Sequence, residues 1–251
     1  MPEAVRAVER ETDVVDGAPL FVEREATRRV VEALERRAAN PDEGDGLDAE
    51  IAKAKQELAP VYAKYAAMPV EEIARDTQAK AIGERLFMNN CAQCHGSDAR
   101  GSKGFPNLTD KDWLHGGTPE KIVESITKGR VGVMPPMAAA VGTTDDVKNV
   151  ANYVLSLAGE PHDSVRAGLG KSKFTACAAC HGIGGVGNQV LGAPNLSDKV
   201  WLHGYGESAI IQMINTGKQN EMPAQEGRLT EAQIRMLASY VWGLSNNTST
   251  A

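Results

Sequence analysis

Hydrophobic side chains recur at three- and four-residue steps in several segments of the chain, which is the period of an amphipathic helix. The segments with this spacing are Leu47 to Met68, Val70 to Asn90, 118–128, 207–216, and two closing segments that begin at Thr144 and Thr230. Threonine suits the first position of a helix because its hydroxyl can accept from a free backbone N–H. Strand patterns are missing throughout. The pattern predicts a mainly α-helical protein.

The first 46 residues differ from the rest in charge. They hold 12 acidic and 7 basic side chains, a balance of −5 against −6 for the whole chain. Glu23 to Ala39 is predicted to form a short charged helix, either in a partly disordered arm or as a docking segment. No run approaches the ~20 apolar residues that cross a bilayer, and no export leader is recognisable. We therefore expect no transmembrane segment in this chain.

The sequence repeats itself from Gly83 onward. The matching stretches are Gly83-x-x-x-Phe87 with Gly170-x-x-x-Phe174, Phe105 to Gly116 with Ala193 to Gly204, Val133-Met134-Pro135 with Glu221-Met222-Pro223, and Ala151 to Val154 with Ala238 to Val241. The offset is 86 residues between Cys94 and Cys180 and 88 residues between Met134 and Met222. We divide the chain into an N-terminal arm (1–46), a helical linker (47–75), a first domain (76–159), a linker (160–167), a second domain (168–246) and a tail (247–251).

All four cysteines lie in two short motifs, one in each repeat. The motifs are Cys91-Ala92-Gln93-Cys94-His95 and Cys177-Ala178-Ala179-Cys180-His181. Cys-x-x-Cys-His is the attachment sequence for c-type haem: the two thiols form thioethers with the vinyl groups, and the histidine is the proximal iron ligand. The sequence therefore predicts two covalently bound haem c groups.

Other uses of the cysteines fit less well. A four-cysteine zinc site has its two pairs roughly 15–20 residues apart, whereas most of a domain separates these two. A thioredoxin-like pair needs flanking strands, and structural disulfides give no reason for a histidine after each pair. Aromatic residues make up only 5% of the chain, and a buried macrocycle would supply the missing apolar bulk. The negative charge argues against nucleic acid as a partner.

A methionine followed by proline stands at the same place in each repeat. Met134 and Met222 come 39 and 41 residues after their histidines, and we predict them as the distal ligands of His95 and His181 respectively. A thioether is a soft ligand that raises the haem potential. Met137 is an alternative to Met134. His115 and His203 are either structural or ligands in some redox state.

The order of elements in each repeat resembles class I cytochrome c. This resemblance implies that the carbonyls of Pro106 and Pro194 orient the proximal imidazoles. It also implies that first and last helices cross within each domain, Gly83 meeting Tyr153 and Gly170 meeting Tyr240. Trp113 and Trp201 are expected beside the haems, as packing or as part of an electron path.

At a finer level the chain is similar to the dihaem cytochrome c subunit (subunit III, CcoP or FixP type) of cbb-type haem-copper oxidases. The stretches that carry the resemblance are Tyr62 to Glu72, Asn90 to Gly101, Phe105 to Trp113, Val133 to Pro136, Cys177 to Gly182 and Ala193 to Trp201. They span about residues 47–246. The resemblance implies an electron-transfer role without a catalytic site, with a donor cytochrome c, the monohaem cytochrome c subunit and the catalytic subunit as partners.

The front of the chain departs from that family. Its members are anchored by transmembrane helices ahead of haem domains on the periplasmic side of the bacterial inner membrane, whereas residues 1–46 are charged. Either the chain is a truncated or engineered form with a replaced N-terminus, or it is a divergent member that relies on other subunits for its placement at the membrane. The alternatives to an oxidase subunit are a free soluble dihaem carrier and a dihaem enzyme such as a peroxidase or thiosulfate dehydrogenase. An enzyme needs an open or displaceable iron position, which the two Met-Pro loops disfavour.

Overall fold

The computed structural model describes residues 25–26, 28–30, 32 and 46–246, and the chain divides into two compact units after Ala67. In the first unit, α3 (Gly46–Ala66) matches the predicted helix and continues through Pro60. The predicted helix over Glu23 to Ala39 and the tail lie largely outside the described residues. None of the helices in the described part is long and apolar enough to cross a membrane.

The second unit contains both repeats, and its described part is mainly helical, as predicted. Its helices are α4 (Val70–Ile73), α5 (Thr77–Asn90), α6 (Ala92–His95), α7 (Pro119–Lys128), α8 (Ala138–Val141), α9 (Thr144–Leu157), α10 (Ser164–Lys173), α11 (Thr175–His181), the 3-10 turn η1 (Ile183–Gly185), α12 (Glu207–Thr216) and α13 (Glu231–Asn246). The predicted helix from Val70 to Asn90 is broken at Asp76, whose carboxylate accepts from the first N–H groups of α5 and caps it.

The N-cap of α9 is one residue earlier than predicted. The hydroxyl of Thr143, not Thr144, accepts from the backbone N–H of Asp146, and the Asp146 carboxylate accepts from Thr143 in return. This reciprocal capping box satisfies two donors at once, which is why it fixes the helix start. Thr230 caps α13 as predicted, accepting from the N–H of Gln233.

A small antiparallel sheet corrects the prediction that strands are absent. β1 (Arg130–Met134) pairs with β2 (Lys218–Met222) in a register that places Arg130 opposite Met222 and Met134 opposite Lys218. Each strand is five residues long, and its partner lies 88 residues away in the chain. A strand this short carries little local signal because its hydrogen bonds depend on a distant segment.

The closing helices are exchanged between the repeats, which corrects the predicted helix crossings. Gly83 of α5 meets α13: a Cβ at this position would lie 2.7 Å from Cβ of Tyr240 and 2.8 Å from the carbonyl oxygen of Met236. Gly170 of α10 meets α9, where a Cβ would collide with the carbonyl oxygen of Asn149. The pairs are therefore Gly83 with Tyr240, and Gly170 with the helix that carries Tyr153.

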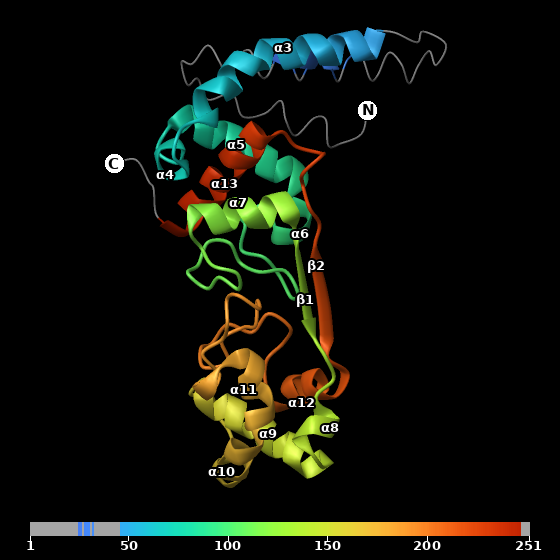
Figure 1. Cartoon of the computed structure of the whole chain (residues 1–251), viewed down its shortest axis with the longest axis vertical. Helices are drawn as coiled ribbons and strands as arrows, with labels where there is room; N and C mark the ends of the chain where they lie inside the picture. Colours follow the sequence, from blue (N-terminus) through green and yellow to red (C-terminus); the bar gives the residue numbers. More distant parts are fainter. Residues whose placement is uncertain (1–24, 27, 31, 33–45, 247–251) are drawn as a thin grey trace. The chain divides into compact units, whose positions relative to one another are not determined.

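Two groups of elements result, which we call lobe A and lobe B. Lobe A comprises residues 68–129 and 222–246, with α4, α5, α6, α7 and α13; lobe B comprises residues 134–217, with α8 to α12. Lobe B is thus inserted into lobe A, entered by β1 and left by β2, which lie side by side in Figure 1. Its closing helix α9 comes before its haem motif in the chain, so lobe B is a cyclic permutation of lobe A.

The core of lobe B combines residues of both repeats. Its buried members are Val141, Val147, Val150, Val154, Phe174, Cys177 and Ile214. Tyr153 of α9 and Phe174 at the end of α10 form an edge-to-face ring contact with centroids 5.2 Å apart. The corresponding contact in lobe A joins Phe87 and Tyr240, with centroids 5.5 Å apart. Burial of apolar surface across the repeats therefore maintains the exchange.

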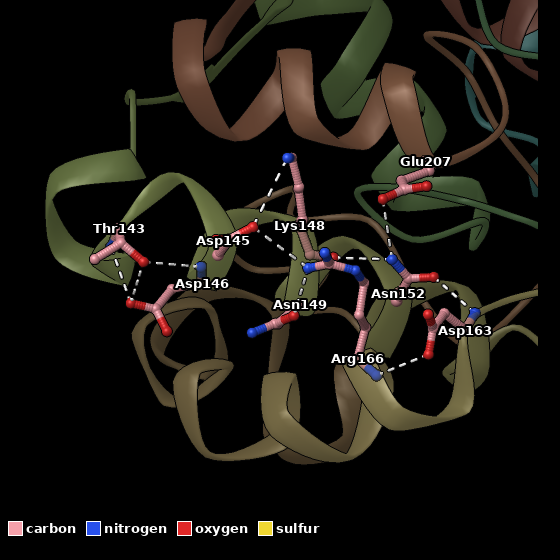
Figure 2. Close-up of polar contacts among 9 residues, drawn as sticks. All are labelled: Thr143, Asp145, Asp146, Lys148, Asn149, Asn152, Asp163, Arg166 and Glu207. Atoms are coloured by element: carbon pink, nitrogen blue, oxygen red, sulfur yellow. Dashed lines mark hydrogen bonds and ion pairs between the residues drawn. The ribbon is translucent and has the colours of Figure 1, made fainter.

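A polar network ties α9 to the second repeat (Figure 2). The buried amide of Asn152 accepts from the backbone N–H of Asp163, which precedes α10, and donates to Glu207 at the start of α12. Arg166 of α10 donates to the side chain of Asn149. The residue that matches Asn152 in α13 is Ser239, which bonds within its own helix instead. The two closing helices are therefore not interchangeable.

Two glycines of α10 give a matched test of this helix crossing. We expect Gly170→Ala to lower the free energy of unfolding by about 1–3 kcal/mol or more, because the added methyl group meets the α9 backbone. Gly168→Ala, whose Cβ would meet nothing within 4 Å, should instead raise stability by about 0.5–1 kcal/mol. Urea unfolding of the two variants measures the difference; equal effects would contradict the crossing.

Candidate haem sites

The motif of lobe A holds its histidine in one tautomer. His95 is buried on α6, and its Nδ1 lies 3.1 Å from the carbonyl oxygen of Pro106. A carbonyl can only accept, so Nδ1 carries the proton and Nε2 keeps a free lone pair. Burial lowers the pKa of this imidazole, which keeps it neutral, although the bond to Pro106 partly opposes the shift. A neutral imidazole with a fixed Nε2 is suited to bind iron.

Lobe B repeats this arrangement. His181 is buried at the end of α11, and its Nδ1 lies 2.9 Å from the carbonyl oxygen of Pro194. Both proline carbonyls therefore make the hydrogen bond that was predicted for them. The second repeat thus holds its imidazole by a proline carbonyl in the same way as the first.

A tight turn after each histidine brings the proline into position. In lobe A the N–H of Gly101 donates to the carbonyl of His95 at 2.7 Å, and in lobe B the N–H of Gly187 donates to that of His181 at 2.8 Å. Both glycines have positive φ, and a side chain at Gly101 would collide with the carbonyl of Phe105. The turn therefore needs glycine, and it fixes where the loop passes the imidazole.

The four cysteines are free thiols that differ in their exposure. Cys91 is partly buried and Cys177 is buried, while Cys94 and Cys180 are exposed. Burial, with a smaller contribution from Cys94, raises the pKa of Cys91 to about 11, and burial likewise raises the pKa of Cys177. No cluster of His, Cys, Asp or Glu suited to a metal ion is found among the residues that the structure describes. The cysteine pairs are therefore not gathered as in a zinc site.

The structure places each methionine in the lobe opposite to the one predicted. Met222 reaches lobe A beside the end of α7, where a Cβ at Gly129 would collide with its carbonyl oxygen. The N–H of Gln225, three residues on, donates to the carbonyl of Ile126 at 3.0 Å. Met222 thus belongs to the lobe of His95.

Met134 lies in lobe B for the equivalent reason. Its carbonyl oxygen lies against Gly217, the residue after α12. Met137 donates its N–H to the carbonyl of Ile214 at 2.8 Å, and its side chain packs against the lobe B core. Both Met134 and Met137 therefore accompany His181 rather than His95.

One unsatisfied donor in lobe B and one on β1, at the edge of lobe A, suit a haem. In the described part of the chain, Nε1 of Trp201 and Nη2 of Arg130 are buried without a hydrogen-bond partner. A buried donor without an acceptor costs about 1–3 kcal/mol, and a haem brings two carboxylates that accept. Trp201 packs on the lobe B core, and Trp113 of the first repeat packs against Gly117. The residues present therefore fit one haem in each lobe.

The two histidines of the repeated loops have different surroundings. Nε2 of His203 accepts from the side-chain amide of Asn220 on β2 at 2.8 Å, whereas the ring of His115 lies against Gly192. Burial lowers the pKa of both, and nearby cations lower them further. The loops also meet each other: the N–H of Gly104 donates to the carbonyl of Leu202 at 2.7 Å.

Several residues of these sites were missed by sequence reasoning. Arg130 and Asn220 lie on strands that were not predicted, and Gln189, which donates to the carbonyl of Trp113 at 3.1 Å, joins the two loops. The sequence pointed to these residues only through the differences between the two repeats. Asn220 aligns with Gly132 of the first repeat, and Gln189 precedes the two-residue insertion in the second repeat.

Comparison with known proteins gives a consistent result. A family model described as cytochrome c oxidase, cbb3-type, subunit III matches residues 78–154 and 169–241. The chain is 63% identical over 203 residues to the cbb3-type cytochrome c oxidase subunit CcoP of Rubrivivax gelatinosus, covering 81% of this chain and 67% of that protein. It is 45% identical over 177 residues to subunit FixP of Bradyrhizobium diazoefficiens, covering 66% and 61%. For CcoP of Cereibacter sphaeroides the identity is 40% over 173 residues, covering 64% and 60%. The chain thus spans less than two thirds of the last two relatives.

Proposed function

Because the chain belongs to the family of cbb3-type cytochrome c oxidase subunit III, we propose that it is a dihaem electron-transfer subunit of such an oxidase. The observation that carries the proposal is the doubled site: each lobe contains a Cys-x-x-Cys-His motif, an imidazole held by a proline carbonyl, and a methionine brought in by a strand. We propose that each lobe has a class I cytochrome c fold, with the exchange of closing helices described above.

We assign the haem ligands by lobe rather than by sequence repeat. The set for lobe A is Cys91, Cys94, His95 and Met222, and the set for lobe B is Cys177, Cys180, His181 and Met134. The strand register supports this assignment, since it carries each methionine across to the other repeat's motif. Met137 is a less suitable ligand than Met134, because its side chain packs into the lobe B core.

The chain's own residues prepare both sites for electron exchange. Each haem iron, when bound, takes up and releases one electron. Pro106 and Pro194 hold the imidazoles, and Trp201 and Arg130 have buried donors for haem carboxylates. Fixed ligands of this kind keep the change in geometry between redox states small, which favours transfer without acid, base or nucleophile. We therefore assign no catalytic residue.

The partners and location are part of the proposal. Electrons would come from a donor cytochrome c and pass to the monohaem cytochrome c subunit and then the catalytic subunit, on the periplasmic side of the inner membrane. The names of the relatives support the oxidase as the assembly. The contact between Gly104 and Leu202 supports transfer within one chain, since it joins the loops of the two motifs.

An absorption spectrum with a haem count tests the function. The purified chain should contain two haems c by pyridine haemochrome, a ferric methionine-to-iron band, and no response of the reduced form to carbon monoxide. A carbon monoxide shift in the wild-type chain would instead indicate an open iron and an enzyme. Co-purification with oxidase subunits separates the subunit from a free carrier, which would purify alone.

A further inference from the structure

A cation stands opposite each proposed distal methionine in the strand ladder. Arg130 on β1 is the cross-strand partner of Met222, and Lys218 on β2 is the partner of Met134. Residues directly opposite each other in an antiparallel pair share a face, with Cβ atoms about 4.5–5.5 Å apart. Arg130 and Lys218 also occupy equivalent positions in the repeat. Each lobe therefore has a basic residue next to its methionine, but the two residues differ in their surroundings.

In lobe A the cation is paired with a carboxylate. Nη1 of Arg130 donates to the Glu124 carboxylate at 2.7 Å, and its Nε donates to Ser125 at 2.9 Å. The side chain of Arg130 is only 21% exposed. The hydrogen bonds from Arg130 and Lys121 lower the pKa of Glu124 to about 2, so this carboxylate is ionised at neutral pH. A negative charge thus accompanies Arg130 beside Met222.

In lobe B the carboxylate is missing. The helix position that matches Glu124 is Gln212 on α12, which has no charge. Lys218 is exposed, and no carboxylate in the described part of the chain forms an ion pair with it. Its charge acts on the loop that contains His203: beyond the effect of burial, Lys218 and Lys103 both lower the pKa of this histidine. Burial, Arg130 and Lys121 lower the pKa of the equivalent His115, and Glu124 opposes them by raising it.

Building on the proposed function, we propose that the uncompensated charge of Lys218 raises the reduction potential of the lobe B haem above that of the lobe A haem. A ferric haem carries one more positive charge than a ferrous haem, so a nearby cation disfavours the ferric form. In lobe A the Glu124 carboxylate offsets this effect of Arg130. At partial reduction, the electron should therefore reside preferentially in lobe B.

Spectroelectrochemical titration of the full dihaem chain tests this inference. The lobe B component is identified as the one that is absent from a Cys177→Ala/Cys180→Ala chain. We expect Lys218→Gln to lower the potential of this component and leave the lobe A component unchanged, while Lys218→Arg keeps the wild-type value. Gln212→Glu, which introduces the missing carboxylate, should lower the same component. Glu124→Gln should raise the lobe A component.

Ionic strength gives a second readout. Since Lys218 is exposed, the difference between wild type and Lys218→Gln should shrink between about 0.01 M and about 1 M salt, as the Debye length falls from about 30 Å to about 3 Å. The inference is overturned if Lys218→Gln leaves both components in place, or if Lys218→Arg shifts the potential as much as Lys218→Gln. A chain with fewer than two haems would instead refute the proposed function, so the two failures are distinguishable.

Discussion

Met134→Ala should open the haem attached at Cys177 and Cys180 to carbon monoxide, whereas Met222→Ala should leave that haem closed. The reason is the exchange between repeats: Met134 lies against Gly217 in lobe B, and Met222 lies against Gly129 in lobe A. Removal of a thioether ligand leaves a vacant iron position and lowers the potential, since methionine ligation raises it. The expected change is from no carbon monoxide binding to one carbon monoxide per modified haem.

A chain with a single attachment motif makes the assignment unambiguous. In a Cys91→Ala/Cys94→Ala chain the remaining haem is that of lobe B, and the absorption of the reduced form is recorded with and without carbon monoxide. Met134→Ala should respond, and Met222→Ala is the matched control in the same background. The opposite pattern would mean that His181 is paired with Met222, as the repeats alone had suggested. Met137→Ala distinguishes the neighbouring methionine and should not respond.

Deletion of residues 131–221 should leave a folded monohaem protein. This deletion joins Arg130 to Met222, which are cross-strand partners in the ladder, so their Cα atoms are separated by about 4.5–5.5 Å and need only a small movement to be linked. The product retains the haem motif of lobe A, Met222 and the helix α13 that packs against α5. We expect one haem per chain, a methionine-ligated spectrum and cooperative unfolding.

Truncation after residue 159 is the control for this deletion. It preserves the whole first repeat but removes α13, whose Met236 and Leu237 are fully buried. Each such side chain contributes about 1.5–3 kcal/mol by its burial, and a domain has only about 5–15 kcal/mol in total. The truncated chain should therefore fail to unfold cooperatively in circular dichroism. If it is as stable as the deletion variant, α9 can close lobe A and the exchange is wrong.

Local chemistry explains why much of the site was predictable. The cysteine spacing and the adjacent histidine are contiguous in sequence, so their chemistry can be read without a fold. The proline carbonyls follow each histidine by 11 and 13 residues, a turn that is closed by glycine within the same loop. Helices 118–128 and 207–216 were found almost to the residue because their periodicity is local.

Non-local contacts explain what was missed. The strand ladder joins segments 88 residues apart in the chain. Which closing helix packs on the first helix of each lobe is decided by side chains such as Asn152, which forms hydrogen bonds to both Asp163 and Glu207. Two similar repeats present two similar closing helices, so the local pattern fits either pairing equally well. The contiguous pairing was assumed, and the helix crossings at Gly83 and Gly170 show that it was wrong.

By itself, the sequence determined that this is a mainly helical protein with two Cys-x-x-Cys-His motifs, and it predicted a proximal histidine and a methionine for each. Only the tertiary structure decided which methionine shares a lobe with which histidine. The physical reason is that haem attachment and helix capping depend on neighbours along the chain. The pairing of first and closing helices within each lobe depends instead on buried contacts between Phe87 and Tyr240 and between Tyr153 and Phe174. These contacts form across the repeats, and the two strands carry the chain between them.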